Sequence, residues 1–261
     1  MILKGFDAGE GPDLVILHGM FGQARNWTQI AKSLSYRFSC HSFDLRNHGA
    51  SPWAPTMDYP AMAGDVADSM SDRGVARAPV IGHSMGGKVA MALALTQPER
   101  VSALIVADIA PASYRAGNLP LVQAMRRIDL SQLSRRAEVD ALLAPDVPDR
   151  MVRSFLLQSL VVEGHGALSW RLNLDALEQE MAVLGDFPVF PETVRYEGPV
   201  LFVAGAKSDY IRPEHRPEIA RLFPQARHVT LKDAAHWVHA DQPEAFARLV
   251  TEFLGAVEKA P

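Results

Sequence analysis

The stretch Gly82-His83-Ser84-Met85-Gly86 constrains this chain more than any other part of its sequence. Glycines at both ends of the pattern allow neighbouring backbone to pass very close to a tight turn that has Ser84 at its tip. Residues 78–81 before the pattern are typical of a short buried strand, and the Ala- and Leu-rich residues 88–97 after it are typical of a helix. The sequence therefore predicts a strand, a strained turn that exposes a serine hydroxyl, and a helix behind it.

Further strand and helix signals alternate on both sides of this turn. Apolar runs predict strands at 13–17, 38–43, 101–108, 198–204 and 226–231. Amphipathic spacing predicts helices at 27–34, with Asn26 as the N-cap, and at 60–72, 214–223 and 243–257. Apolar runs without polar interruption suit strands that are buried on both faces of a parallel sheet. The alternation predicts an α/β fold with a doubly wound, mostly parallel sheet.

Residues from about 111 to 196 break this alternation, because they carry helical signals and no convincing strand. Helices are expected at 119–128, 137–143, 149–160 and 174–184. A connection of this length exceeds an ordinary crossover between strands. We therefore expect residues 1–110 and 197–261 to form the sheet domain, and residues 111–196 to form a helical cap, or lid, over the strand ends. The alternative is a group of extra packing helices with no role at the site.

The composition excludes several classes of function. Hydrophobic residues make up 48% of the chain and charged residues 21%, which is ordinary for a globular protein, and the formal net charge of −4 predicts no nucleic-acid partner. Cys40 is the only cysteine, so neither an intrachain disulfide nor a multi-cysteine zinc site is possible. We expect a cytoplasmic protein with no membrane partner, because the chain shows no secretory signal and no apolar run of about 20 residues. The oligomeric state does not follow from the sequence.

A serine hydroxyl is a weak nucleophile until a base takes its proton. His236 is the candidate base, because it lies in the loop after the last expected strand. The histidine in turn needs a carboxylate to hold its tautomer. Asp108 ends the strand that follows the helix behind Ser84, and Asp209 follows the next-to-last strand, so both satisfy the chain order Ser, Asp, His. The residues alone leave the choice of acid open.

The negative charge that develops during attack on a carbonyl needs two backbone N–H donors. One is expected from Met85, directly after the serine, and the other from Met20 in the glycine-containing loop at 18–22, with Phe21 as the less favoured alternative. A further set of aromatic and imidazole side chains is expected to line a substrate pocket. These candidates are Phe21, His83, Tyr114, Trp170 and Trp237.

Several stretches of the chain resemble the α/β-hydrolase superfamily and, within it, the small bacterial esterases related to YbfF. They are His-Gly-Met-Phe-Gly at 18–22, Asp-Leu-Arg-Asn-His-Gly at 44–49, Gly-His-Ser-Met-Gly-Gly-Lys at 82–88, Asp-Ile-Ala-Pro at 108–111, Trp-Arg-Leu-Asn at 170–173 and Ala-His-Trp-Val-His at 235–239. The resemblance covers essentially the whole chain and implies the α/β-hydrolase fold. It also favours Asp108 as the acid. The superfamily's usual acid falls here on Ser208, and Asp209 comes one residue late.

The resemblance implies hydrolysis of a carboxylic ester or thioester, with a short to medium acyl chain, through an acyl-Ser84 intermediate. It implies a Ser-His-Asp triad, a small-molecule substrate as partner, and no metal or organic cofactor. Cleavage of a carbon–carbon bond, perhydrolysis and amide hydrolysis are alternatives on the same triad. A non-catalytic receptor for a small ligand is an alternative of another class.

Overall fold

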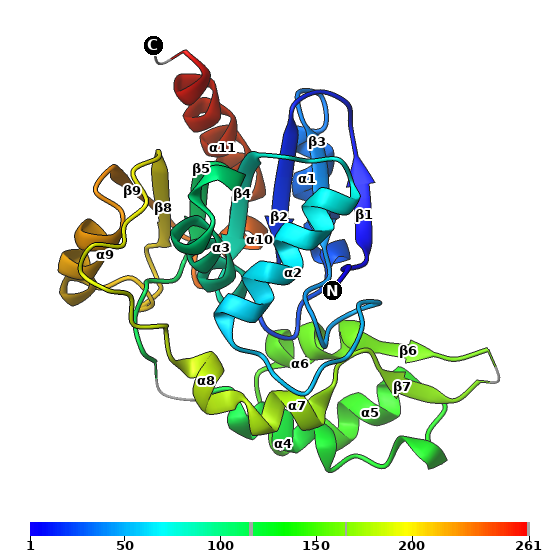
Figure 1. Ribbon diagram of the computed structural model, residues 1–261. Helices are drawn as coiled ribbons and strands as arrows, with labels where there is room; N and C mark the ends of the chain where they lie inside the picture. Colours follow the sequence, from blue (N-terminus) through cyan, green and yellow to red (C-terminus); the bar gives the residue numbers. More distant parts are fainter. Residues whose placement is uncertain (115–116, 165, 260–261) are drawn as a thin grey trace.

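The computed structural model describes residues 1–114, 117–164 and 166–259, and a seven-stranded sheet forms its centre (Figure 1). Across the sheet the strands are β1 (Gly5–Ala8), β3 (Ser39–Phe43), β2 (Asp13–Leu17), β4 (Ala78–His83), β5 (Val101–Ala107), β8 (Val200–Gly205) and β9 (Ala226–Leu231). All neighbouring pairs are parallel except β1 with β3. The mostly parallel, doubly wound sheet predicted from the sequence is confirmed.

Helices cover both faces of this sheet. One face carries α2 (Tyr59–Asp72), α3 (Met85–Thr96) and α9 (Arg216–Leu222), and the other carries α1 (Thr28–Leu34), α10 (Val238–Asp241) and α11 (Pro243–Glu258). Strand side chains alternate between the two cores. On β2, Val15 and Leu17 join the first core while Leu14 and Ile16 join the second. This two-sided burial explains why the strands appear as unbroken apolar runs in the sequence.

The first forty residues contain one strand that was not predicted and one helix cap that was predicted wrongly. The edge strand β1 was not expected, because its four residues alternate between half-buried and exposed positions and carry no apolar run. Asn26 does not cap α1, which begins at Thr28 after a 3₁₀ turn. The Asn26 side chain lies inside that turn, where its Oδ1 accepts a hydrogen bond from the Gln23 N–H at 2.7 Å.

Residues 111–196 connect β5 to β8, which are neighbours in the sheet, and are here called the insertion. Its helices are α4 (Leu119–Arg126), α5 (Arg136–Leu143), α6 (Arg150–Leu156), α7 (Leu174–Gln179) and α8 (Met181–Gly185). The expectation that the insertion has no strands is wrong, because β6 (Leu160–Val162) and β7 (Leu168–Trp170) form an antiparallel hairpin. Two adjacent β-branched residues, Val161 and Val162, favour extended backbone, and Gly166 adopts a φ of +86° near the turn.

The insertion lies together on one side of the sheet, below it in Figure 1. Its backbone joins the loop after β3 through an antiparallel bridge between His48 and Leu172. Asn173 strengthens this junction. Its N–H donates to the carbonyl of Asn47 at 3.0 Å, and its Nδ2 donates to the Asn47 side-chain oxygen at 3.0 Å. The Arg-Asn-His-Gly and Trp-Arg-Leu-Asn stretches of the sequence are therefore contact partners.

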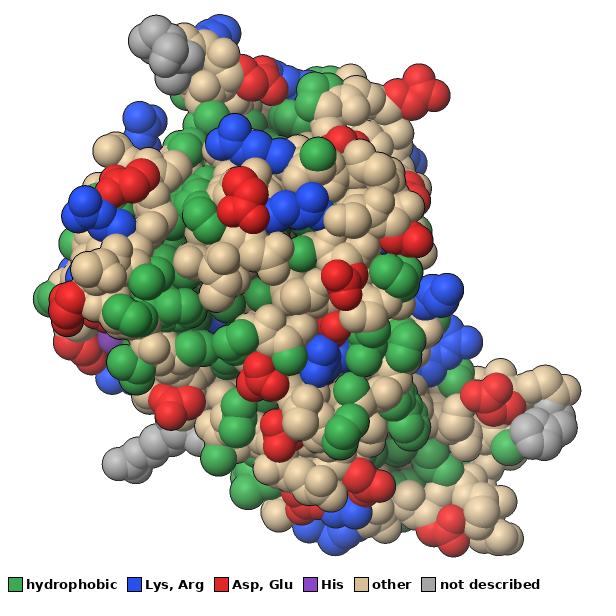
Figure 2. All heavy atoms as spheres, in the orientation of Figure 1, with side chains coloured by type: hydrophobic (Ala, Val, Ile, Leu, Met, Phe, Trp, Pro, Cys, Tyr) green, Lys and Arg blue, Asp and Glu red, His purple; other side chains and the backbone are tan. Residues whose placement is uncertain are grey.

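Acidic and basic side chains are intermixed over the face of the molecule that Figure 2 shows, and neither sign forms a continuous patch there. Among the helices of the described residues, none combines the length and the apolar character that crossing a membrane requires.

Candidate active site

Ser84 lies at the turn between β4 and α3, with a φ of 52° and a ψ of −120°. Positive φ is strained for a residue with a side chain, and such strain persists only where the surroundings enforce it. Close backbone contacts enforce it here. A Cβ on Gly82 would lie 2.2 Å from the Gly86 carbonyl oxygen, and a Cβ on Gly86 would lie 2.4 Å from the His18 carbonyl oxygen. Only glycine fits at both positions, which explains the pattern seen in the sequence.

His236 follows β9 in the loop before α10 and contacts Ser84 directly. Its Nε2 lies 3.0 Å from the Ser84 Oγ, and its Nδ1 lies 2.8 Å from the Asp108 Oδ2. An ionised carboxylate only accepts hydrogen bonds, so the Nδ1 carries the proton and the Nε2 offers its lone pair to the serine hydroxyl. This tautomer is the one that a general base needs.

Asp108 is completely buried and stands at the end of β5 with a φ of 53°. Besides His236, its carboxylate accepts hydrogen bonds from the Gly205 N–H at 3.0 Å and from the Ser208 hydroxyl. The alternative acid, Asp209, is exposed, and its carboxylate makes no hydrogen bond within the described part of the chain. The structure therefore joins His236 to Asp108 and not to Asp209. Ser208, which stands at the superfamily's usual acid position, supports Asp108 instead.

Two backbone N–H groups near Ser84 are available to a ligand. Met85 is the first residue of α3, so its N–H has no partner within the helix. Met20 lines the same cavity as Ser84, and its N–H donates to no other described residue. The N–H of Phe21, by contrast, donates to the His48 Nε2 at 3.3 Å and is occupied.

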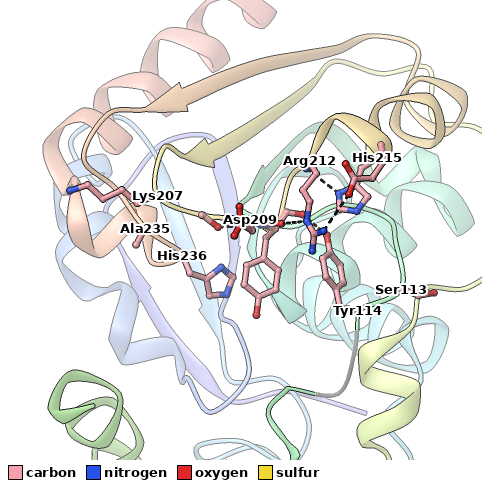
Figure 3. Close-up of a pocket in the computed structure, with 11 residues that line it drawn as sticks. Ser113, Tyr114, Lys207, Asp209, Arg212, His215, Ala235 and His236 are labelled. Carbon is pink, nitrogen blue, oxygen red and sulfur yellow. Dashed lines mark hydrogen bonds and ion pairs between the residues drawn. The ribbon is translucent and has the colours of Figure 1, made fainter. Parts of the chain in front are cut away.

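Ser84 lines a cavity of about 60 Å³ between the sheet domain and the insertion. Its walls are apolar or aromatic apart from Ser84, Lys88 and Asn118, and α8 contributes Met181 and Leu184. A larger hollow of about 730 Å³ shares lining residues with this cavity and reaches His236. Figure 3 shows the side chains that line the larger hollow, His236 among them. Tyr114 and Tyr210 line both spaces, so this pair forms the wall between them.

Tyr210 is a residue of this site that the sequence analysis missed. Its ring stacks on the His236 imidazole with centroids 4.0 Å apart and planes 23° apart. Its backbone carbonyl accepts a hydrogen bond from the Tyr114 hydroxyl at 2.5 Å, and that hydroxyl also accepts from the Ala110 N–H. The available signal was an aromatic residue two positions after Ser208, in a loop beyond the carboxyl end of a strand.

The remaining pocket candidates are dispersed. His83 donates from Nε2 to the carbonyl of His236 at 2.8 Å, and burial lowers its pKa well below the usual range, so it remains neutral beside His236. Phe21 is buried in the core. Trp170 lines a separate hollow of about 460 Å³ next to α4, and Trp237 lines a third hollow, where its ring contacts Phe155. Of the five candidates, only Tyr114 lines the cavity that contains Ser84.

Comparison with known proteins adds a family-level finding. The family model described as the alpha/beta hydrolase fold matches residues 12–243. The chain is 40% identical to the sn-1-specific diacylglycerol lipase ABHD11 of Mus musculus, over 93% of this chain and 81% of the relative. It is 34% identical to the esterase YbfF of Escherichia coli K12, over 92% of each chain. A solved structure described as a marine microorganism esterase superposes with a TM-score of 0.92 at 35% identity, covering 95% of this chain and 97% of that one.

Proposed function

Because the chain belongs to the α/β-hydrolase fold family, as its sequence motifs predict, we propose that it hydrolyses carboxylic esters or thioesters with Ser84 as the nucleophile. The observation that carries the proposal is the unbroken hydrogen-bonded chain from the Ser84 hydroxyl through both nitrogens of His236 to Asp108. The names of the similar proteins, a diacylglycerol lipase and esterases, support an ester as the substrate.

In the proposed reaction the Ser84 Oγ attacks the carbonyl carbon of the substrate while its proton passes to the His236 Nε2. The tetrahedral intermediate collapses, and His236 returns that proton to the departing alcohol or thiol. A water molecule then gives a proton to His236 as it attacks the acyl-Ser84 carbonyl, and His236 passes that proton to the Ser84 Oγ as the carboxylic acid departs, which restores the serine. Asp108 remains ionised throughout and stabilises the imidazolium that forms twice in each cycle.

The charge on the substrate oxygen is stabilised by the N–H groups of Met20 and Met85 in this scheme. Removing one such donor in other hydrolases costs about 10²–10³-fold in rate. The neutral state of His83 also contributes, because a second cation directly behind His236 would disfavour the imidazolium.

The dimensions of the two spaces suggest how a substrate is divided between them. A cavity of about 60 Å³ holds only a few non-hydrogen atoms, so a short acyl group is the proposed occupant beside Ser84. The alcohol or thiol part would extend past Tyr210 into the hollow of about 730 Å³. Since α8 supplies part of the acyl cavity wall, we assign the insertion the role of a cap that shapes the pocket.

The direct test is Ser84→Ala assayed with p-nitrophenyl acetate. We expect kcat/KM to fall by about 10⁴-fold or more, because the remaining groups supply no nucleophile. Ser33→Ala is the matched control, since Ser33 is an exposed serine of α1 whose hydroxyl bonds only to its own helix. Ester turnover by Ser84→Ala at the rate of the control would refute the proposal, and ligand binding without turnover by the wild-type protein would favour the receptor alternative.

A further inference from the structure

Lys88 is a buried cation on the helix that carries Ser84, one turn further along the chain. Its N–H donates to the Ser84 carbonyl at 3.1 Å, and its side chain is 2% exposed and lines the same cavity as Ser84. The reaction proposed above does not use it. A lysine in such a place is costly, because an ammonium group loses its hydration on burial and must find partners within the protein.

The partners of Lys88 belong to the end of α8. Its Nζ donates to the carbonyls of Gly185 at 3.0 Å and Asp186 at 2.6 Å. Carbonyls at the end of a helix have no partner within it, so both can accept a hydrogen bond from the Lys88 ammonium. The rings of Tyr59 and Tyr114 also lie near the Nζ, at 5.4 and 4.9 Å, and cation–π attraction contributes to holding it there.

The same end of α8 also receives hydrogen bonds from the sheet domain and the loop after β5, where the Ser113 hydroxyl donates to the Asp186 carboxylate. The Tyr59 hydroxyl donates to the carbonyl of Leu184 at 2.7 Å, and the Tyr114 N–H donates to the carbonyl of Gly185 at 2.8 Å. Lys88 adds a charged contact, which is stronger than a neutral one. Because Met181 and Leu184 of α8 form part of the cavity wall, these contacts determine how close that wall lies to Ser84.

We propose that Lys88 is a positioning residue that ties α8 to the helix carrying Ser84, and that this tie limits the length of acyl chain the enzyme accepts. The inference rests on the ester hydrolysis proposed above. Without the ammonium, the wall formed by Met181 and Leu184 would move away from Ser84. The cavity would then accommodate longer chains and would hold short ones less well.

The test compares kcat/KM for p-nitrophenyl acetate and p-nitrophenyl octanoate in Lys88→Met. We expect the octanoate-to-acetate ratio to rise about tenfold, in the range that a few methylene contacts in a pocket are worth. The change should come from a higher KM for acetate, with its kcat within about threefold of wild type, because Ser84, His236 and Asp108 are untouched. Lys88→Arg keeps a cation with N–H donors and should restore the wild-type ratio.

Arg136→Met is the matched control. Arg136 also donates to two insertion carbonyls, those of Leu157 at 2.7 Å and Leu160 at 3.0 Å, but it does not line the Ser84 cavity. Its loss should leave the ratio unchanged. A ratio that is the same in Lys88→Met as in wild type would overturn the inference, and so would an equal change in Arg136→Met.

A readout that does not require turnover separates this inference from the proposed function. Amide hydrogen exchange over residues 181–186 should be faster in folded Lys88→Met than in wild type or Arg136→Met. If the wild-type protein hydrolyses neither ester, the proposed function fails, while faster exchange would still support the tie between Lys88 and α8. Exchange equal to that of wild type would overturn the tie itself.

The wild-type protein provides a measurement should Lys88→Met fail to fold. Burial lowers the pKa of Lys88 to about 7, and the nearby Asp186 carboxylate opposes this shift. The other titratable groups around the cavity are Tyr59, Tyr114 and Tyr210, whose pKa values burial raises, so they remain neutral at pH 9.

Between pH 6 and 9 the octanoate-to-acetate ratio should rise as Lys88 loses its proton. Any effect of pH that acts equally on both esters cancels in the ratio. A ratio independent of pH would contradict the inference.

Discussion

The sheet domain and the insertion both form walls of the Ser84 site, but they position their residues in different ways. On the sheet side, Ser84 and Asp108 stand at strand ends with positive φ values, held by backbone that leaves no room for a Cβ at Gly82 or Gly86. On the insertion side, α8 and the residues that flank it are held mostly by hydrogen bonds that involve side chains, among them those of Tyr59 and Lys88.

This difference assigns the chemical reaction to residues at the strand ends and the selection of substrates to the insertion. Groups on the ends of buried strands cannot shift without disturbing the core, which suits residues that must align within a few tenths of an ångström. A short helix held by a few polar contacts can shift at small cost, which suits a wall that selects substrates. We therefore expect changes at the strand ends and in the core to act on kcat or global stability, and changes to the contacts that hold the insertion to act on KM.

After Ser84→Ala, Asp108→Asn should give the largest effect on the sheet side. The amide preserves the shape but cannot hold His236 in the tautomer that accepts the serine proton, so kcat/KM should fall about 10³–10⁴-fold. Asp209→Asn is the matched control, because Asp209 is exposed and bonds to neither His236 nor Ser84 through its side chain. Steady-state assays with p-nitrophenyl acetate distinguish the two. A loss confined to Asp209→Asn would show that Asp108 is the wrong acid.

The next largest effect is expected at acidic pH, which should destabilise the sheet domain. Burial lowers the pKa of His18 to about 4 and those of His48 and His239 to about 3, against about 6.5 in the unfolded chain. Below pH 6.5 the unfolded chain therefore binds protons that the folded protein cannot. The contribution of these neutral histidines to the free energy of unfolding is fully present above pH 6.5, and it is lost as the pH falls toward 4. The lowered pKa of His18 alone reduces the free energy of unfolding by roughly 3 kcal/mol by pH 4.

Urea unfolding at pH 7.5 and at pH 4.5, followed by tryptophan fluorescence, measures this loss. Equal free energies of unfolding at the two pH values would contradict the burial of neutral imidazoles beneath the site.

Asn173→Ala should give the smallest effect and act on the insertion side. Its side-chain oxygen caps α7 by accepting from the Ala176 N–H, and its Nδ2 donates to the Asn47 Oδ1. We expect the free energy of unfolding to fall by about 1 kcal/mol, mostly from the lost cap. The KM for p-nitrophenyl acetate should rise severalfold, with kcat unchanged, because the junction to the sheet domain weakens.

Asn173→Asp separates the two roles, since it keeps the capping oxygen and removes the donor to Asn47. Its stability should stay close to wild type while its KM rises as in Asn173→Ala. A drop in kcat with an unchanged KM would show that this junction affects the chemistry rather than the pocket.

Much of the sheet domain was predictable because its signals are local. Strands buried on both faces must be apolar along their whole length, so β2, β4, β5 and β8 are visible as unbroken runs. The turn at Ser84 is equally visible, because only glycine tolerates the backbone contacts on either side of it. The edge strand β1 and the hairpin of β6 and β7 were missed, since short strands on a surface need no apolar run.

The fold family, Ser84 and the candidate base His236 could be inferred from the amino-acid sequence, because each follows from residue types at fixed places relative to buried strands. The identity of the carboxylate that contacts this histidine follows only from the folded arrangement of the chain. Asp108 and Asp209 both follow strands in the right order, and the choice depends on which side chain points inward from adjacent strand ends. Tyr210 and Lys88 likewise acquire their contacts only when the loop after β8 and the end of α8 close around Ser84. The contacts of Lys88 with Asp186 and of Asp108 with His236 join residues about 100 or more positions apart, and Tyr210 stacks on a residue in a different loop, so no local pattern records them.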